Sequence, residues 1–393
     1  MLRGRTSSMR RVLFLDPRLS HVTGGGERLT LETIRALDAT RFQLSVLTRD
    51  CGPSPLFGEF RHACPHVEVV ALDVPRFGDS TVVRRFVGRH GGAALVGKDP
   101  AVDDAVAFNA VAGEIVNRGD WDSVSCSFLT DVFELGPSCP IALHIYGLPP
   151  IEMAGVEAPL LRRVTAFSAV SSFVRDEFCA LFGGLVPKSA VTVILPSLSE
   201  PFFAGGGGPM RDIDFACAGR LVPRKGVDVA IRAVAALVSS GEANPALAIA
   251  GEGPERPALE ALCRDLRVQD AVWFLGELNA EALCRLLDRV RWFVHPARKP
   301  EAFGLAGLEA MARGVPCLAS TPGGMSEYLR HGCNGWEIAA SDPELFAEGM
   351  RTVLRQGFPE ESFRANARAT AAQFSRTEFA RAVNAFYLAA SET

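Results

Sequence analysis

Two glutamates in the second half of the chain, with the residues between them, could together bind a phosphorylated sugar. Glu301 and Glu309 are eight positions apart, and the residues between them, AFGLAGL, are apolar with two glycines. The pattern LAGLEAMARG predicts a helix that a glycine ends. Phe303, Gly304 and Leu305 would then lie at the helix N-terminus, where free N–H groups and the helix dipole favour an anion.

Each glutamate needs a function of its own, because a carboxylate repels a bound phosphate. An ionised carboxylate can only accept hydrogen bonds, and sugar hydroxyl groups are natural donors for it. The segment therefore predicts a phosphate-binding helix end that is flanked by two acids, each of which contacts hydroxyl groups.

A second group of candidate residues is cationic. The loop GRLVPRKG contains Arg220, Arg224 and Lys225, and it follows a strand-like run at residues 214–218. Arginine offers a planar fork of donors and lysine a point charge, and both suit a diphosphate. A solvated surface loop is the alternative interpretation of the same pattern.

Two further candidates lie in the first half of the chain. His144 ends the strand-like run in ALHIYG, and a side chain at the carboxyl end of a parallel strand faces the ligand crevice. A lone histidine can equally be hydrogen-bonded within the fold. Gly24 and Gly25, in GGGER, allow close approach to the backbone, although a tight turn also explains them. Their spacing does not fit the dinucleotide fingerprint, so NAD binding is not predicted.

The elements that must position these residues alternate between strands and helices, which is typical of α/β domains with parallel sheets. Since the carboxyl ends of parallel strands line one crevice, the cationic loop, the glycine turns and the two-acid segment are expected to face a common site. The strand-like runs are residues 11–17, 42–47, 67–72, 123–128, 141–146, 191–196, 214–218, 246–251, 272–278 and 292–296.

The chain has 393 residues, which is too long for one hydrophobic core and predicts two domains. Four glycines in a row within PSLSEPFFAGGGGPMRD mark the boundary. Residues 1–8 are expected to be a disordered tail. The expected parts are an N-terminal domain at 9–197, a linker at 198–210, a C-terminal domain at 211–374 and a final helix at 375–393.

Charge and amino-acid composition exclude several classes of function. A net charge of −4 gives no reason to expect nucleic-acid binding. The ten cysteines form no C-x-x-C pair, so neither a disulfide framework nor a metal site is predicted, and Cys217 and Cys317 are expected to be buried thiols. No apolar run is long enough for a transmembrane helix. We expect a cytoplasmic protein. The basic segment 84–98 is either a solvated helix face or a peripheral contact with the inner membrane face.

Taken together, the motifs identify a resemblance that covers nearly the whole chain and is strongest at residues 214–336. The sequence resembles retaining glycosyltransferases of family 4 (glycosyl transferases group 1), whose GT-B architecture has two Rossmann-like domains facing a central cleft. The matching pieces, in chain order, are GGGER, ALHIYG, AVSSFVRDEF, GRLVPRKG, GEGPE, VWFLGEL, EAFGLAGLE, PGGMSEYL and NGW.

The resemblance implies a metal-independent hexosyltransferase of polysaccharide biosynthesis, with a UDP- or GDP-sugar as donor, no cofactor and a glycan, lipid-linked or small-molecule hydroxyl acceptor. It implies that Arg220 and Lys225 hold the diphosphate and that Glu301 contacts the donor sugar. It also implies that the remaining site residues bind other parts of the donor. The backbone at 303–305 would bind phosphate, Glu309 the ribose and Leu278 the base, with His144 near the sugar and Gly24 and Gly25 closing on the diphosphate or acceptor.

The chain departs from the family pattern at two places. The linker strand ends in Pro196-Ser197-Leu198-Ser199, where the family has Asn-Gly-Val-Asp, and His144 is followed by Ile145 in place of an aspartate. Two alternatives therefore stay open. One is another GT-B enzyme, such as a sugar-nucleotide epimerase, and the other is a non-catalytic GT-B subunit that binds nucleotide or glycan.

Overall fold

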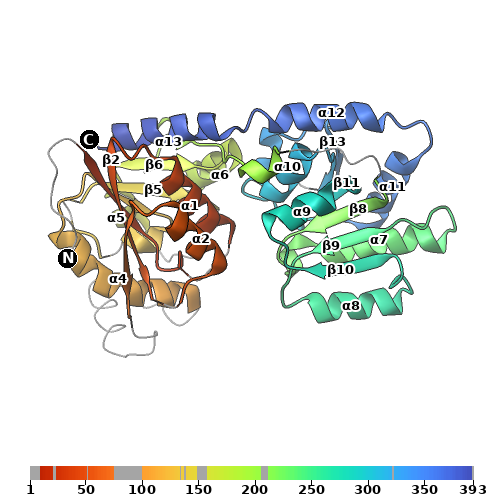
Figure 1. The fold of residues 1–393 in the computed structure, drawn as a ribbon, viewed down its shortest axis with the longest axis horizontal. Coiled ribbons are helices and arrows are strands. Elements are labelled where there is room, and N and C mark those ends of the chain that lie inside the picture. Colours follow the sequence, from red (N-terminus) through yellow and green to blue (C-terminus); the bar gives the residue numbers. More distant parts are fainter. Residues whose placement is uncertain are drawn as a thin grey trace. The chain divides into compact units, whose positions relative to one another are not determined.

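The computed structural model describes residues 9–20, 24–50, 52–74, 100–132, 134–136, 139–147, 157–204, 211–320 and 323–391. The chain forms two compact units, each built around one parallel sheet (Figure 1). The first unit comprises the chain up to Leu195 together with the residues from Thr377 onward, and the second comprises Pro196–Arg376. Both units are Rossmann-like α/β structures, which confirms the predicted fold class.

The sheet of the first unit has the strand order β3-β2-β1-β4-β5-β6-β7, and every neighbouring pair is parallel. Its strands are β1 (Arg10–Leu15), β2 (Phe42–Arg49), β3 (Glu68–Leu72), β4 (Ser123–Cys126), β5 (Ile141–Ile145), β6 (Ala166–Ala169) and β7 (Val191–Val193). The helices of this unit are α1 (Gly25–Ala36), α2 (Pro55–Ala63), α4 (Pro100–Arg118), α5 (Glu157–Leu161), α6 (Ser172–Phe182) and α13 (Arg376–Ala390).

The second sheet has the order β10-β9-β8-β11-β12-β13 and is also parallel throughout. Its strands are β8 (Ile213–Ala218), β9 (Leu247–Ala250), β10 (Val272–Gly276), β11 (Val290–His295), β12 (Cys317–Ser320) and β13 (Gly335–Ile338). The helices are α7 (Val227–Ser239), α8 (Arg256–Asp265), α9 (Ala280–Leu287), α10 (Leu305–Ala312), α11 (Pro343–Leu354) and α12 (Glu360–Ala371).

The central strands are short and buried along nearly all of their length, as expected when helices cover both faces of a parallel sheet. Polar side chains define where several helices begin. Ser171 caps α6, Asn279 caps α9 and Asp342 caps α11, each accepting a hydrogen bond from a backbone N–H in the first turn. Cys217 and Cys317 are buried and unbridged, as the sequence predicts.

Helix α13 completes the hydrophobic core of the first unit (Figure 1). Phe379, Val383 and Phe386 are buried in the same cluster as the strand residues Phe14 and Phe42. These residues recur at the spacing of one helix face, which explains why the helix buries that face against the sheet. The first unit is therefore assembled from two stretches of chain that the whole second unit separates.

The division between the units falls at Leu195, two residues before the expected boundary. Residues 198–204, which the sequence analysis assigned to a linker, belong to the second unit, and the glycine run at 205–208 lies outside the described residues. The expected tail at 1–8 and the whole basic segment at 84–98 also lie outside them. Within the ranges that the model describes, no helix is both long and apolar enough to cross a bilayer.

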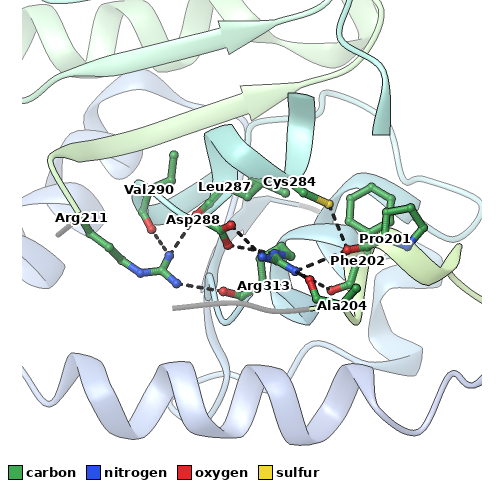
Figure 2. A network of polar contacts seen from close by, with 9 residues as sticks. All are labelled: Pro201, Phe202, Ala204, Arg211, Cys284, Leu287, Asp288, Val290 and Arg313. Carbon is green, nitrogen blue, oxygen red and sulfur yellow. Dashed lines mark hydrogen bonds and ion pairs between the residues drawn. The ribbon is translucent and has the colours of Figure 1, made fainter. Parts of the chain in front are cut away.

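Arg313 holds the segment after the boundary against the second unit (Figure 2). Its guanidinium makes two hydrogen bonds to the carboxylate of Asp288, at 2.9 and 2.7 Å, and one of 2.7 Å to the carbonyl oxygen of Ala204. It also donates to the carbonyl oxygens of Pro201 and Phe202. Because the planar fork of arginine satisfies all these acceptors at once, the segment is held by a side chain that is itself buried.

Replacing Arg313 with methionine is expected to destabilise the second unit by about 3 kcal/mol, because the carboxylate of Asp288 and three carbonyl groups lose a buried donor. Urea unfolding followed by circular dichroism measures the effect. Arg289→Met is the matched control, since Arg289 pairs with Asp212 on the surface and its loss should cost less than about 1 kcal/mol. Equal effects of the two substitutions would contradict the assigned role of Arg313.

Candidate functional site

The strand order of the second sheet reverses between β8 and β11, and this is where an open α/β sheet forms a crevice. A cavity lies at the carboxyl ends of these two strands. Gly219 and Arg220 line it from the loop after β8, and His295 and Pro296 line it from the end of β11. Lys225, further along the cationic loop, completes this part of the lining. The fold thus brings the predicted cationic loop to the switch point of the sheet.

An ion pair joins the cationic loop to the first of the two predicted acids. The Nζ atom of Lys225 lies 2.7 Å from Oε1 of Glu301, and a guanidinium nitrogen of Arg224 lies 3.4 Å from the same oxygen. Burial opposes ionisation of Glu301, but Lys225 and its neighbours outweigh this effect and hold the pKa of the carboxyl below its usual value. Glu301 is therefore an ionised acceptor at neutral pH.

Arg220 is exposed beside this ion pair. Within the described part of the chain its guanidinium makes no hydrogen bond or ion pair. Its position leaves a full set of donors directed at the solvent or at a ligand, which suits the predicted diphosphate contact.

His295 is a site residue that the sequence analysis missed. It is the last residue of β11 and is 5% exposed, and its Nε2 atom has no hydrogen-bond partner among the described residues. That atom lies 3.8 Å from Oε1 of Glu301. Burial, helped by the charge of Lys225, lowers the pKa of His295 to about 4, so the imidazole is neutral at physiological pH. Like His144, His295 lies at the carboxyl end of a parallel strand, so its position in the sequence carries the same signal.

The two-acid segment has the expected helix, α10, whose N-cap is Gly304 in the left-handed conformation at φ 81°. Among the described residues no side chain caps this helix end, which leaves its first N–H groups available for an anion. Phe303 packs its ring against Tyr328, and the hydroxyl of Tyr328 donates to the carbonyl oxygen of Gly304 at 2.5 Å. The ring of Phe303 thus fixes the backbone from which a phosphate contact would be made.

The other predicted donor contacts lie in the same unit. Glu309 is in the second turn of α10 and is 6% exposed. Leu278 lies between β10 and α9, where it is half-buried, and Leu275 on β10 is exposed. Leu305 is the first residue of α10. The described geometry brings Arg220, Lys225 and Glu301 together, whereas the contacts expected of Glu309 and Leu278 stay predictions.

His144 lies in the first unit and has a different environment from the one expected. Its Nδ1 atom is 2.6 Å from the hydroxyl of Ser168, and its Nε2 atom is 2.7 Å from the hydroxyl of Tyr387 on α13. The ring also stacks on Tyr146. Both nitrogens are therefore satisfied inside the fold, so neither is free to contact a substrate in this structure. The alternative interpretation of a lone histidine, as a hydrogen-bonded core residue, describes this geometry.

Gly24 and Gly25 lie at the start of α1, near the carboxyl end of β1. Gly24 is the N-cap and has an extended backbone at φ −92°, and no side chain within the described ranges caps the helix. A Cβ atom added to Gly25 would meet no described atom within 4 Å. The structure therefore leaves this helix end open but does not itself require glycine at position 25. The loop that precedes it, residues 21–23, lies outside the described ranges.

Two buried carboxyl groups occupy the switch point of the first sheet, between β1 and β4. Burial raises the pKa of Asp16 to about 6 and that of Asp131 to about 8. Repulsion from Asp16 further raises the pKa of Asp131, and repulsion from Glu27 further raises that of Asp16, while Arg18 lowers both. The sequence analysis did not select these residues, because nothing in the local pattern shows that Asp131 faces Asp16. The part of the chain that the structure describes contains no group of three potential metal ligands.

Comparisons with known structures assign the architecture. The crystal structure of Anabaena Alr3699/HepE in complex with UDP and glucose superposes on this chain with a TM-score of 0.73. The superposition covers 95% of this chain and 97% of that one, at 18% sequence identity. The protein therefore has the GT-B fold, with two Rossmann-like α/β domains.

Comparisons with known sequences concern mainly the second unit. Residues 199–370 match the model of the family described as glycosyl transferases group 1. An uncharacterized glycosyltransferase of Methanocaldococcus jannaschii is 33% identical over 205 residues, which are 49% of this chain and 51% of that protein. The glycogen synthase of Mycobacterium tuberculosis is 34% identical over 206 residues, which are 52% of this chain and 49% of the synthase. The chain thus spans about half the length of these curated relatives.

The burial of His144 predicts a pH dependence of stability. Burial lowers its pKa from 6.5 to about 4 in the folded protein, so the unfolded chain binds the proton more readily between these values. This histidine should therefore remove up to about 3 kcal/mol of stability as the pH falls from 6.5 to 4.

Urea unfolding of the wild type and of His144→Gln at several pH values measures this contribution. The difference in unfolding free energy between the two should fall steadily below pH 6.5. His66→Gln, at an exposed histidine of the same unit, should show no such trend. A difference for His144→Gln that does not change with pH would contradict the buried neutral imidazole.

Proposed function

We propose that the protein is a glycosyltransferase that moves a hexosyl group from a nucleotide-diphosphate sugar to a hydroxyl acceptor. The observation that carries the proposal is the ion pair of Lys225 with Glu301 beside the exposed Arg220, at the switch point of the second sheet. The pair lies inside the region that matches the glycosyl transferases group 1 family. A cation for a diphosphate and an acceptor for a sugar hydroxyl are thus adjacent.

The chemistry follows from where charge develops. As the bond between the anomeric carbon and the diphosphate breaks, the sugar becomes oxocarbenium-like and negative charge accumulates on the leaving group. Arg220, Lys225 and the N-terminus of α10 are fixed donors that stabilise this charge. These donors support a reaction that needs no metal ion. In this proposal Glu301 binds sugar hydroxyls, Glu309 binds the ribose and Leu278 lies near the base.

Retention of the anomeric configuration is part of the proposal and rests on the resemblance to family 4. A front-face attack, in which the leaving phosphate takes the proton of the acceptor, requires no protein nucleophile. A double displacement would need a carboxylate beneath the sugar. Glu301 is already bound to Lys225, which favours a role in binding over one as a nucleophile.

The donor and acceptor are proposed only by class. The neighbouring structure with UDP and glucose supports a uridine donor, and a guanosine donor is the alternative. For the acceptor we propose a glycan, a lipid-linked sugar or a small molecule, as in polysaccharide biosynthesis at the cytoplasmic side of a membrane. Peripheral membrane contact rests on the basic segment at 84–98, and a liposome sedimentation assay that finds no binding would remove it.

The second candidate function is a non-catalytic GT-B subunit that binds nucleotide or glycan. The specific observation in its favour is His144, whose two ring nitrogens are both used inside the first unit. Such a protein would bind a nucleotide sugar but would not release free nucleotide from it. A sugar-nucleotide epimerase, by contrast, would convert the donor without any acceptor.

Nucleotide release from UDP-, GDP- and ADP-sugars over a broad acceptor panel tests the proposal. The wild type should release nucleotide from one donor, and Arg220→Ala and Glu301→Ala should each lower kcat/KM by about 100-fold or more, because each removes a contact to the reacting group. Arg232→Ala, at an exposed arginine on α7, is the control and should leave kcat/KM unchanged. Absence of nucleotide release with every donor and acceptor would refute the enzyme assignment.

A further inference from the structure

One carboxylate oxygen of the site, Oε1 of Glu301, has both cationic neighbours and a histidine neighbour, and the guanidinium of Arg224 lies 3.4 Å from it. Oε1 of Glu301 is 2.7 Å from Nζ of Lys225 and 3.8 Å from Nε2 of His295. The first distance is an ion pair with a hydrogen bond, and the second is too long for a hydrogen bond. The carboxylate is therefore satisfied by lysine, while the imidazole nitrogen beside it is not.

The buried Nε2 atom of His295 lowers the stability of the fold as long as it has no hydrogen-bond partner. His295 is 5% exposed, and its Nε2 atom has no partner in the described part of the chain. Leaving a buried polar atom unpaired costs about 1–3 kcal/mol, and such atoms often mark a place that a ligand fills. His295 also lines the cavity at the switch point, so a ligand in that cavity can reach it.

The separation of 3.8 Å between Oε1 and Nε2 fits one intervening oxygen. An oxygen about 2.8 Å from each atom can form a hydrogen bond with both. A hydroxyl group matches this place, because it donates to a carboxylate and accepts from an imidazole N–H at the same time. A phosphate oxygen would not fit, since it would meet the carboxylate with like charge.

We propose that His295 and Glu301 together bind a single hydroxyl group of the donor sugar, so that His295 is a specificity-determining residue of the site. This inference rests on the proposed function, because it assigns one contact within the donor-binding site. Lys225 holds Oε1 of Glu301 before the donor arrives. When the diphosphate binds Lys225, that oxygen is released, and the hydroxyl group then bridges it to Nε2 of His295.

The arrangement links recognition of the sugar to recognition of the diphosphate. The ammonium of Lys225 exchanges one anionic partner for another, and the guanidinium of Arg224, 3.4 Å from Oε1, remains beside the released carboxylate. Oε1 of Glu301 then loses its contact with Lys225 when a diphosphate is present and becomes accessible to the sugar hydroxyl. The neutral state of His295 supports this role, because a charged imidazolium would itself pair with Glu301 and block the hydroxyl.

The test combines substitutions at His295 with donor analogues. UDP-glucose and GDP-mannose are compared with their monodeoxy analogues at each sugar hydroxyl, using calorimetry for affinity and nucleotide release for kcat/KM. In the wild type, one deoxy analogue should bind about 10–100-fold more weakly than the natural donor. This is the effect expected when a hydroxyl that makes two hydrogen bonds is removed. His295→Ala should bind the natural donor about tenfold more weakly than the wild type does. Removal of that same hydroxyl should then have a much smaller effect on the affinity of the variant.

Two further variants separate binding of the sugar from a purely structural role. His295→Gln should restore part of the lost affinity, because its side-chain amide can donate a hydrogen bond from a similar position. His331→Gln, at an exposed histidine of the same unit, should behave as the wild type. Affinity for UDP or GDP alone should change less than about twofold in His295→Ala, which also shows that this variant is folded.

The outcomes distinguish this inference from the proposed function. If each deoxy analogue loses affinity equally in the wild type and in His295→Ala, His295 does not contact a sugar hydroxyl and the inference is overturned, even if the enzyme is active. If nucleotide sugars bind with the expected coupling but are never turned over, the contact stands and the transferase assignment falls. A wild type that binds neither nucleotide sugar overturns both.

Discussion

Close packing of one backbone segment against another is the constraint on which the candidate site depends. A Cβ atom at Gly251 would collide with the carbonyl oxygen of Gly219, and one at Gly226 would collide with that of Pro296. Both glycines also have positive φ angles, of 140° and 66°. Glycine is thus required for a steric reason at each place. The loops after β8, β9 and β11 lie so close together that the side chains of Lys225, Glu301 and His295 meet.

This constraint explains why the second unit could be predicted well from the sequence. Three kinds of local pattern are visible in the sequence. They are glycines that a turn requires, apolar runs and a charged loop. The strands, helices and the positions of Arg220, Lys225 and Glu301 at one edge of the sheet followed from them. Strand order was not predicted, because it is set by which long-range contacts bury the most surface.

The residues whose surroundings differ from those expected, or that the sequence did not single out, mostly depend on contacts between distant parts of the chain. His144 was expected to face a ligand, but its partner Tyr387 lies 243 positions further along the sequence. Arg313 donates a hydrogen bond to Ala204, which lies more than 100 positions before it in the sequence. Because no local pattern shows this contact, residues 198–204 were predicted to be a linker. His295 was overlooked although its position at a strand end is local. The sequence shows that His295 ends a strand, but it does not show that the histidine lies next to Glu301. That neighbour is what makes His295 a candidate site residue.

The placement of α13 has a consequence for how the protein is made. The first unit lacks the core residues Phe379, Val383 and Tyr387 until the last part of the chain has been synthesised. The second unit, by contrast, is continuous in sequence and can complete its core earlier. During translation the N-terminal unit must therefore wait with part of its apolar surface uncovered, while the unit made after it folds first. Uncovered apolar surface of this kind is the general physical cause of aggregation during the folding of multidomain chains.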